Sequence, residues 1–281
     1  MLRIAVPNKG SLSDAASEML TEAGYRQRHD SRDLTIADPD NDVEFFYLRP
    51  RDIAVYVGEG TLDVGLTGRD LMLDSRAPVR ELLTLGFGES TFAFAGPVGR
   101  FSSVADLAGV RVATAYPGLV RAFFKERSVD AHVVRLDGAV ETAVRLGVAD
   151  AVADVVSTGA TLRRAGLEPF GEPLLRSEAV LICRGEAAAP ADLDVFLRRI
   201  QGVLVARRFV MLDYDVPAPY VDAACEITPG IESPTVSPLQ REGWYAVRAM
   251  VPTLEAQSVM DRLYDVGARG IIVTTIHACR L

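Results

Sequence analysis

A run of small and hydroxyl-bearing residues follows an apolar stretch in the middle of the chain, where residues 154–161 read Asp-Val-Val-Ser-Thr-Gly-Ala-Thr. This order predicts a buried strand, a tight turn and the first turn of a helix. Unpaired backbone N–H groups, hydroxyl donors and a glycine that permits close approach together form a cradle for phosphate. The turn that would supply them consists of Ser157, Thr158, Gly159, Ala160 and Thr161. The alternative is a plain helix cap after a buried strand, and the pattern alone favours neither.

A carboxylate stands just before this turn. Asp154 lies where an acidic side chain can reach a ribose hydroxyl, or a Mg²⁺ ion that bridges to a pyrophosphate group. The alternative is a structural aspartate at the end of a buried strand. The segment is not a P-loop, because the Gly-Lys-Ser/Thr sequence of that motif is missing.

Basic residues follow two earlier apolar runs. Lys9 stands in a Pro-Asn-Lys-Gly turn after the first predicted strand, where an ammonium group can neutralise a phosphate. Arg49 and Arg51 flank Pro50 and can add positive potential to a cleft. The alternatives are a solvated turn lysine and surface arginines that pair with nearby acids.

Further candidates lie at other predicted strand ends. Gly68 and Asp70 belong to a Thr-Gly-Arg-Asp segment that could hold a purine edge or a ribose, or could merely start a helix. Tyr116 could stack on a base or cap the core. Asp137 and Glu141 lie four residues apart at the start of a predicted helix, where carboxylates usually complement the helix dipole.

Residues suited to proton chemistry are scarce. The three histidines, His29, His132 and His277, are scattered outside these turns. The sequence contains no Gly-x-Ser-x-Gly motif, metal-ligand cluster or Rossmann glycine pattern, so a hydrolase with a histidine base is disfavoured. We therefore expect a site that binds phosphates and needs little proton transfer.

The composition bounds the class of protein. The 281 residues include 49% hydrophobic and 24% charged residues, which is ordinary for a globular chain, and the net charge of −8 argues against a nucleic-acid binder. Three distant cysteines without CxxC spacing predict neither a disulfide framework nor a zinc knuckle. The sequence shows no signal peptide and no run of about 20 apolar residues. We expect a cytoplasmic protein with no membrane and no nucleic-acid partner.

Short apolar runs alternate with amphipathic segments over the first two thirds of the chain, which predicts parallel strands joined by crossover helices. Two similar α/β lobes are expected, with a ligand-binding cleft between them. A helix is expected over residues 137–146. The expected strands are Leu2–Val6, Val43–Leu48, Leu62–Thr67, Val110–Thr114, Val133–Leu136, Ala151–Val156 and Ser177–Cys183.

The last part of the chain forms a pattern of its own. Strands are expected at Val210–Asp215, Trp244–Val251 and Ile271–Ile276, with an amphipathic helix over Leu254–Val266. This βαβ-like tail has no phosphate-binding turn and is long enough to be a separate small domain.

Several blocks of sequence together resemble ATP phosphoribosyltransferase, the first enzyme of histidine biosynthesis, and the tail resembles that of its long form. The blocks cover residues 4–12, 67–70, 113–117, 136–141, 154–162, 211–215 and 229–235. The resemblance implies an α/β fold of two lobes like those of type II periplasmic binding proteins, plus a ferredoxin-like (ACT-like) C-terminal domain. It implies catalytic lobe I at residues 1–90 and 184–210, catalytic lobe II at 91–183, and a regulatory histidine-binding domain at 211–281.

The implied reaction joins N1 of ATP to C1 of 5-phospho-α-D-ribose 1-diphosphate, giving 1-(5-phospho-β-D-ribosyl)-ATP and pyrophosphate, and it requires Mg²⁺. By resemblance the Ser157–Thr161 turn holds the 5-phosphate and Asp154 contacts the ribose, with Asp154 and Lys9 as the catalytic residues. The residues implied at the nucleotide or the pyrophosphate are Lys9, Gly10, Arg49, Gly68, Asp70 and Tyr116. No residue is assigned as a metal ligand.

The resemblance also implies feedback inhibition by L-histidine and homo-oligomers from dimer to hexamer. The implied effector residues are Asp215, Ile231, Ser233, Thr235 and Gly270. Asp215 could pair with a cationic or N–H group of the effector, and the alternative is that it caps the helix after Pro217.

Two rival functions remain from the sequence. A non-catalytic two-lobe protein that binds small molecules would share the architecture, although the missing signal peptide and helix-turn-helix count against its transport and regulatory forms. A different phosphoribosyltransferase would usually carry two adjacent acids in its loop, and no second acid follows Asp154.

Overall fold

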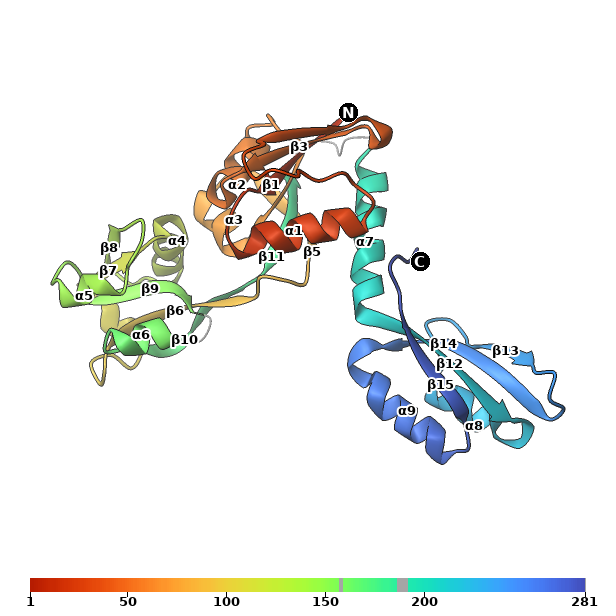
Figure 1. The fold of residues 1–281 in the computed structure, drawn as a ribbon. Helices are drawn as coiled ribbons and strands as arrows, with labels where there is room; N and C mark the ends of the chain where they lie inside the picture. Colours follow the sequence, from red (N-terminus) through yellow and green to blue (C-terminus); the bar gives the residue numbers. More distant parts are fainter. Residues whose placement is uncertain (157–158, 186–191, 281) are drawn as a thin grey trace. The chain divides into compact units, whose positions relative to one another are not determined.

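The computed structural model describes residues 1–156, 159–185 and 192–280 (Figure 1). The described chain forms three sheets and divides into two compact units. The first unit consists of Met1–Glu18 and Arg26–Leu193, and the second of Met19–Tyr25 and Asp194–Leu281.

The first lobe of the first unit is a six-stranded sheet with the order β2-β3-β1-β4-β11-β5. Apolar residues fill its central strands, so β4 is buried along its whole length. The strands are β1 (Leu2–Pro7), β2 (Thr35–Asp38), β3 (Val43–Leu48), β4 (Val64–Gly68), β5 (Val79–Thr84) and β11 (Ala179–Arg184). The helices of this part of the chain are α1 (Ser11–Glu22), α2 (Pro50–Gly58) and α3 (Arg69–Ser75).

The second lobe is a five-stranded sheet with the order β10-β6-β9-β7-β8. Its strands are β6 (Ser90–Pro97), β7 (Arg111–Thr114), β8 (His132–Arg135), β9 (Ala151–Val156) and β10 (Leu167–Ser177). Its helices are α4 (Pro117–Arg127), α5 (Thr142–Arg145) and α6 (Ala160–Arg164). An aromatic cluster around the fully buried Phe94 fills one face of this sheet.

Both lobes repeat one strand order. In each, three parallel strands are followed by an antiparallel strand that comes from another part of the chain: β3-β1-β4 is followed by β11, and β8-β7-β9 by β6. This is the arrangement of type II periplasmic binding proteins. The α/β prediction with two such lobes is therefore confirmed.

The structure corrects one boundary inside the first unit. Residues up to 183 were assigned to the second lobe, but β11 pairs with β4 and β5 and so belongs to the first sheet. A continuous apolar run marks a buried strand without identifying the sheet that receives it, because its partners lie more than 90 residues away in the sequence.

Two other expectations differ from the structure. The helix expected over residues 137–146 is only the single turn α5, because Ala139 adopts a left-handed backbone conformation with φ 46° that interrupts helix formation.

The edge strand β10 was not expected, because its Pro and Gly residues are typical of turns. An edge position tolerates them, with a register shift between Phe170 and Leu175.

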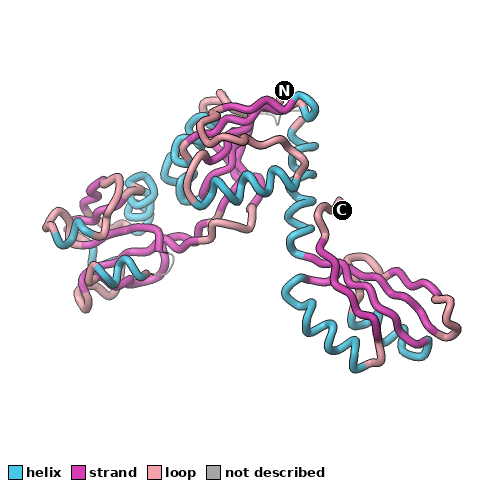
Figure 2. The backbone as a smooth tube through the Cα atoms, in the orientation of Figure 1, coloured by secondary structure: helices cyan, strands magenta, loops and turns pink. Residues whose placement is uncertain are grey.

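The second unit has the βαββαβ order of a ferredoxin-like domain, as expected. Its antiparallel sheet has the order β13-β14-β12-β15, and Figure 2 shows α8 and α9 on the same face of that sheet. Its elements are α7 (Leu193–Arg208), β12 (Phe209–Pro217), α8 (Val221–Ile227), β13 (Thr235–Pro238), β14 (Trp244–Pro252), α9 (Ala256–Asp265) and β15 (Arg269–Thr275). By its contacts α7 groups with this unit, whereas residues 184–210 had been assigned to the first lobe.

Buried and half-buried residues alternate along β12, so one face of this sheet is the core face and the other is partly exposed. Val210, Leu212, Tyr214 and Val216 are buried with residues of α8 and α9, while the residues between them are half-buried. Short 3-10 helices complete the described elements: η1 (Pro39–Asn41), η2 (Val104–Leu107), η3 (Ala218–Tyr220) and η4 (Thr253–Glu255).

Truncating the centre of the second lobe should destabilise it strongly. The Phe94 ring centroid lies 5.4 Å from that of Phe124 and 5.5 Å from that of Phe123, and Phe94 is fully buried. We expect Phe94→Ala to lower the free energy of unfolding by about 3–5 kcal/mol in urea titrations. Phe123→Ala, which truncates a half-buried ring of the same cluster, should cost only about 1 kcal/mol. Equal losses for the two variants would contradict the assignment of Phe94 as the centre of the core.

Candidate functional site

The carboxyl ends of neighbouring parallel strands gather the first group of candidate residues. Pro7 pairs with Leu48 across β1 and β3, and the Asn8 N–H donates to the Leu48 carbonyl at 2.8 Å. Lys9 and Arg49, the residues that follow, are both exposed at this edge. Two cations therefore stand where ligands of open α/β sheets usually bind.

Asn8 is a member of this edge that the sequence did not single out. Within the described part of the chain its Oδ1 atom is buried and accepts no hydrogen bond. A buried acceptor usually finds a donor, so this amide is suited to a ligand N–H or hydroxyl group, or to a water molecule. Its place next to Lys9 in the turn was the only available signal.

The Asp70 carboxylate occupies space that only a glycine at position 68 leaves open. A Cβ atom at Gly68 would lie 2.3 Å from the Asp70 Oδ1 atom, so any other residue would displace that carboxylate. Asp70 is 7% exposed, its N–H donates to the Ser177 hydroxyl oxygen at 3.0 Å, and that hydroxyl donates back to Oδ1 at 3.0 Å. The role of Gly68 is therefore to make room for Asp70.

Tyr116 approaches Asp70 from the second lobe. Burial raises the pKa of the Tyr116 phenol above its ordinary value, and the charges of Asp70 and Asp154 and a hydrogen bond to Asp70 add to this shift. The ring packs edge-on against Phe92 at 5.1 Å, and the Arg51 guanidinium lies 4.9 Å from its centroid. Tyr116 thus packs on the core and also reaches the site with its hydroxyl group.

Asp154 lies near the end of β9 as a half-buried carboxylate. Burial raises its pKa, the negative charges of Glu141 and Asp70 act in the same direction, and the Val155 N–H and Arg51 oppose them. The Val155 N–H donates to Asp154 Oδ1 at 2.8 Å. The structure therefore brings Asp70, Tyr116 and Asp154 into one electrostatic environment.

The predicted phosphate turn is described from Gly159 onward, and Ser157 and Thr158 lie outside the described residues. Gly159 has φ 67°, a left-handed conformation in which a branched side chain is strained. Helix α6 has only five residues, so its dipole is small. An anion bound at this turn would therefore depend on backbone N–H groups rather than on a helix dipole.

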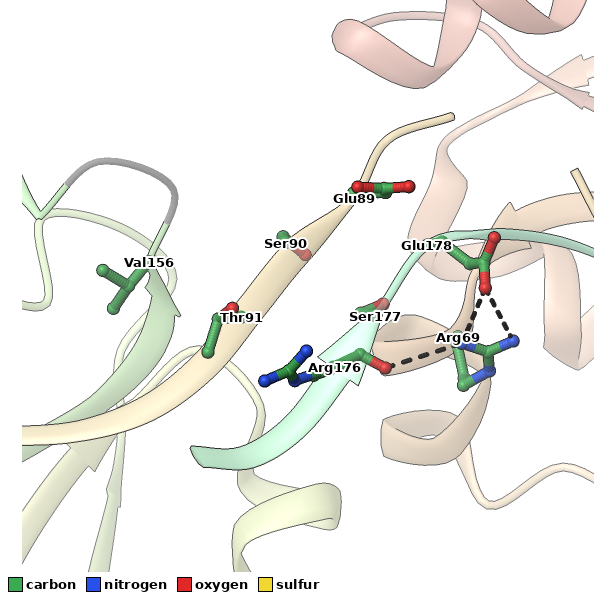
Figure 3. A pocket seen from close by; sticks show the side chains of 8 residues that line it. All are labelled: Arg69, Glu89, Ser90, Thr91, Val156, Arg176, Ser177 and Glu178. Atoms are coloured by element: carbon green, nitrogen blue, oxygen red, sulfur yellow. Dashed lines mark hydrogen bonds and ion pairs between the residues drawn. The ribbon is translucent and has the colours of Figure 1, made fainter. Parts of the chain in front are cut away.

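A cavity of about 470 Å³ opens at the end of β9, where the chain crosses between the two lobes (Figure 3). Its lining includes Val156, the last residue of β9, and two arginines that the sequence did not identify as site residues. Arg69 is held by ion pairs to Glu81 and Glu178, whereas Arg176 is exposed. The full lining is Arg69, Glu89, Ser90, Thr91, Val156, Arg176, Ser177 and Glu178.

The second unit has a cavity of about 410 Å³ on the sheet face that lies opposite its buried core. Three of the five expected effector residues, Asp215, Thr235 and Gly270, line it, whereas Ile231 and Ser233 do not. Ser237 and Arg248, which the sequence did not single out, also line it.

Asp215 does not act as a helix cap. The N-cap residues of η3 and α8 are Pro217 and Tyr220, so Asp215 is not the cap residue of either helix. A Cβ atom at Gly270 would lie 3.5 Å from Asp215 Oδ2, and Gly270 has φ 59°. Gly270 therefore meets a backbone requirement as well as leaving room beside Asp215.

Comparison with known proteins identifies the family. The family model described as ATP phosphoribosyltransferase matches residues 49–202, and the one described as HisG, C-terminal domain, matches residues 206–278. The chain is 63% identical to the ATP phosphoribosyltransferase of Pseudarthrobacter chlorophenolicus and 61% identical to that of Streptomyces avermitilis, over the whole of each chain. The chain belongs to the ATP phosphoribosyltransferase family. It is accordingly a transferase of the first step of histidine biosynthesis.

A solved structure agrees with this family. The ATP phosphoribosyltransferase (HisG:HisZ) complex from Thermotoga maritima aligns with a TM-score of 0.62 and 25% identity, over 72% of this chain and 97% of that one. Within the described residues, no helix is long and apolar enough to cross a membrane.

Replacing Asp154 with asparagine should reduce activity without reducing stability. Because burial raises the pKa of Asp154, its ionised form is destabilising above that pKa, and this cost vanishes in acid, where the carboxyl is protonated in both the folded and unfolded chains. We expect Asp154→Asn at pH 7 to keep or raise the free energy of unfolding, while the turnover per folded molecule falls at least about tenfold.

Asp150, which directly precedes β9 in the same lobe, is the matched control. Hydrogen bonds from Arg111 lower its pKa, so its charge stabilises the fold above its ordinary range and this contribution is lost as the pH falls. Asp150→Asn should therefore lose stability at pH 7 and keep turnover. A drop in melting temperature with normal turnover for Asp154→Asn would show that Asp154 is structural.

Proposed function

We propose that the first unit transfers the 5-phosphoribosyl group of 5-phospho-α-D-ribose 1-diphosphate to N1 of ATP, with its reacting centre at Asp70, Tyr116 and Asp154. The observation that carries this location is the meeting of these three side chains, from two lobes, beside the phosphate turn. The products are 1-(5-phospho-β-D-ribosyl)-ATP and pyrophosphate.

The chemistry suits a site without a histidine base. N1 of adenine has a free lone pair, so no proton must be removed before it attacks C1. The C1–O bond to pyrophosphate breaks as the N1–C1 bond forms on the opposite face, which inverts C1 from α to β. Positive charge develops on the ribose ring, and buried carboxylates such as Asp154 stabilise it, while the site holds N1 in line with C1.

The remaining residues would bind the substrates. The Ser157–Thr161 turn holds the 5-phosphate through backbone N–H and hydroxyl groups, and Asp154 accepts hydrogen bonds from the ribose. Lys9, Gly10 and Arg49, at the ends of β1 and β3, bind the nucleotide or the departing pyrophosphate. Tyr116 stays protonated at neutral pH, because its pKa is raised, and it therefore remains a hydrogen-bond donor.

The donor set fits a Mg²⁺ ion that arrives with substrate phosphates. The described residues contain no group of three or more His, Cys, Asp or Glu side chains placed to hold a metal. Mg²⁺ usually takes one or two carboxylates and completes its shell with phosphates and water, and Asp70 and Asp154 can supply these carboxylates. When bound, the ion would offset the negative charge of the pyrophosphate leaving group.

We further propose that the protein is cytoplasmic and assembles with copies of itself, from dimer to hexamer. The support for assembly is the Thermotoga maritima neighbour, which is itself a complex.

A direct assay tests the reaction and separates it from non-catalytic binding. Purified protein, ATP, 5-phospho-α-D-ribose 1-diphosphate and Mg²⁺ are mixed, and the phosphoribosylated ATP is followed by mass spectrometry. Omitting each component in turn should abolish the product. Binding of both substrates without product would instead favour the non-catalytic two-lobe protein.

The phosphate turn should not tolerate bulk at Gly159. Valine there would be strained at φ 67°, and its side chain would lie against Arg163, whose Nη1 is 3.1 Å from a Cβ placed on Gly159. We expect Gly159→Val to weaken binding of 5-phospho-α-D-ribose 1-diphosphate at least about tenfold in calorimetric titrations, with the melting temperature changed by only a few degrees. Unchanged affinity would place the 5-phosphate elsewhere.

We propose that the cavity of the second unit binds L-histidine as a feedback inhibitor. A free amino acid offers one carboxylate and one ammonium group, and the cavity offers both signs of charge in Arg248 and Asp215. Arg248 is paired with Asp213 at 2.6 Å, while no ion pair involving Asp215 occurs within the described residues. The Asp215 carboxylate is therefore suited to the ammonium or the imidazole of the effector.

Removing this carboxylate should separate inhibition from catalysis. We expect Asp215→Ala to keep the uninhibited rate and to raise the histidine concentration for half-inhibition at least about tenfold, because the ligand loses a charge-assisted contact. Asp222→Ala, which removes an exposed carboxylate on α8 outside the cavity, should leave inhibition unchanged. Normal inhibition of the Asp215 variant would show that this cavity is not the effector site.

A further inference from the structure

Helix α4 of the second lobe begins without a cap of its own. Tyr116 occupies its N-cap position and forms no side-chain capping hydrogen bond, although short polar residues are preferred there. Pro117 has no N–H group, so Gly118 and Leu119 carry the first free donors of the helix. These two N–H groups need acceptors from elsewhere.

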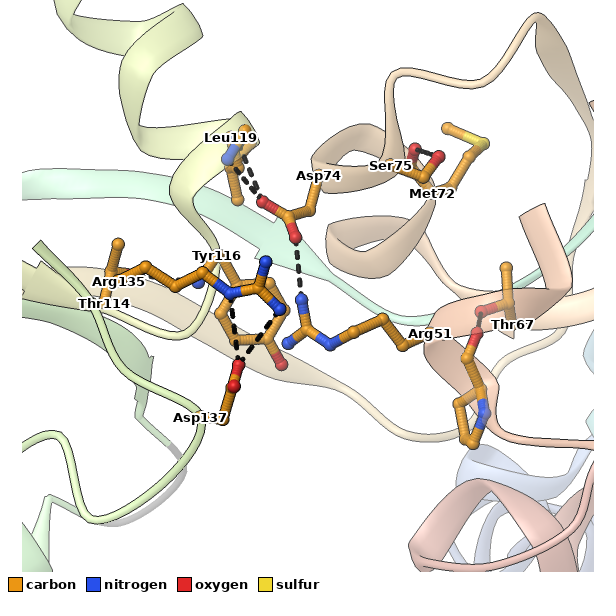
Figure 4. A network of polar contacts seen from close by, with 12 residues as sticks. Arg51, Thr67, Met72, Asp74, Ser75, Thr114, Tyr116, Leu119, Arg135 and Asp137 are labelled. Carbon is orange, nitrogen blue, oxygen red and sulfur yellow. Dashed lines mark hydrogen bonds and ion pairs between the residues drawn. The ribbon is translucent and has the colours of Figure 1, made fainter. Parts of the chain in front are cut away.

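Asp74 of the other lobe accepts the hydrogen bonds of both N–H groups. It lies on α3 of the first lobe, and its Oδ1 atom accepts the N–H of Gly118 at 2.7 Å and that of Leu119 at 3.1 Å. Its side chain is 9% exposed. Figure 4 shows this carboxylate pointing at the start of α4. A helix of one lobe is thus capped by a carboxylate of the other.

Close approach of the two helices depends on glycine at position 118. A Cβ atom there would lie 2.1 Å from the Asp74 backbone oxygen, a distance that any other residue would force to increase. The Gly118 backbone is not in the left-handed region, so alanine would be tolerated by the helix itself and would disturb only this contact. Arg76 adds a second link, because its Nη2 donates to the Gly118 carbonyl at 3.0 Å.

The same carboxylate orients a residue of the site. Asp74 Oδ2 accepts a hydrogen bond from Arg51 Nη1 at 2.8 Å, and the Arg51 guanidinium in turn lies 4.9 Å from the Tyr116 ring centroid (Figure 4). The charge of Arg51 favours the ionised form of Asp154. One carboxylate therefore connects the contact between the lobes to the electrostatics of the reacting centre.

We propose that Asp74 is a positioning residue for the transfer reaction: it latches α4 of the second lobe to α3 of the first, and so holds Tyr116 against Asp70 with Arg51 beside the Tyr116 ring. Substrates that contact both lobes bind best when the lobes are latched. Loosening the latch lowers the fraction of competent molecules, so apparent affinity falls by that fraction. Saturating substrate restores the closed arrangement, and kcat changes less than KM.

Amide hydrogen exchange tests the latch without reference to activity. In the full-length protein, Asp74→Ala should speed exchange at Gly118 and Leu119 at least about tenfold, because their acceptor is gone. Peptides from β6 in the same lobe should keep their protection, which shows that the fold is intact. Asp74→Asn keeps an oxygen acceptor and should restore most of the protection.

Kinetics tests the positioning role, which depends on the proposed location of the reacting centre. Asp74→Ala and Gly118→Ala loosen the same contact from its two sides, and each should raise the KM of a substrate about tenfold while kcat changes less than about threefold. Asp74→Asn should lie between these variants and the parent. Asp150→Asn, which removes a carboxylate that binds Arg111 within the second lobe alone, should leave both constants unchanged.

The possible results distinguish the existence of the latch from its positioning role in the reaction. Unchanged exchange at Gly118 and Leu119 in Asp74→Ala would show that no latch exists. Faster exchange with an unchanged KM would show that Asp74 caps α4 but positions nothing for the reaction. If Asp74→Ala raises KM and Gly118→Ala does not, the contact between the lobes is not the cause. The test of the latch does not depend on the proposed location of the reacting centre, because hydrogen exchange at Gly118 and Leu119 measures the latch directly.

Discussion

The charge of Asp70 in one lobe raises the pKa of Asp154 and of Tyr116 in the other, and the site depends on how this repulsion is contained. Buried charges require partners, because desolvation otherwise neutralises them. The Ser177 hydroxyl donates a hydrogen bond to Asp70, and the Val155 N–H donates one to Asp154. Arg51 supplies the nearby positive charge. The charge that remains uncompensated suits a ligand that develops positive charge on a ribose ring.

The topology explains how these groups meet. The chain passes from β5 of the first sheet to β6 of the second and returns from β10 to β11, so short connections tie the two sheets together. Ser177, the last residue of β10, bonds directly to Asp70. The parallel strands of each lobe end where the candidate residues begin: Lys9 and Asp70 in one lobe, Tyr116 in the other. A repeated fold thus places strand ends from both lobes at the proposed reacting centre, where Asp70 and Tyr116 meet.

Local sequence predicted much of this arrangement and failed where distant partners decide. The strands β1, β3, β7 and β9 follow from apolar runs. Gly159 was predicted as a residue that permits close approach, and the structure adds that its backbone is left-handed. The sheet that receives β11 depends on pairing with β4, which no local pattern encodes. The partners of Asp74 are two N–H groups more than 40 residues away, so its acidic side chain resembled any surface charge in the sequence. Asn8 was passed over for a related reason, because burial is set by the folded chain.

The second unit would, in the proposed regulatory role, respond to an effector without taking part in the chemistry. Its core is closed by α8 and α9 on one face of the sheet, so the opposite face of β12 can carry polar groups without loss of stability. On that face Asp213 pairs with Arg248, and Asp215 lines the cavity with no ion pair among the described residues. Binding energy gained there reaches the first unit only if two global states differ in affinity for the effector. A contact between lobes that rests on a few hydrogen bonds, as at Asp74, is the kind of element that a modest coupling free energy can shift.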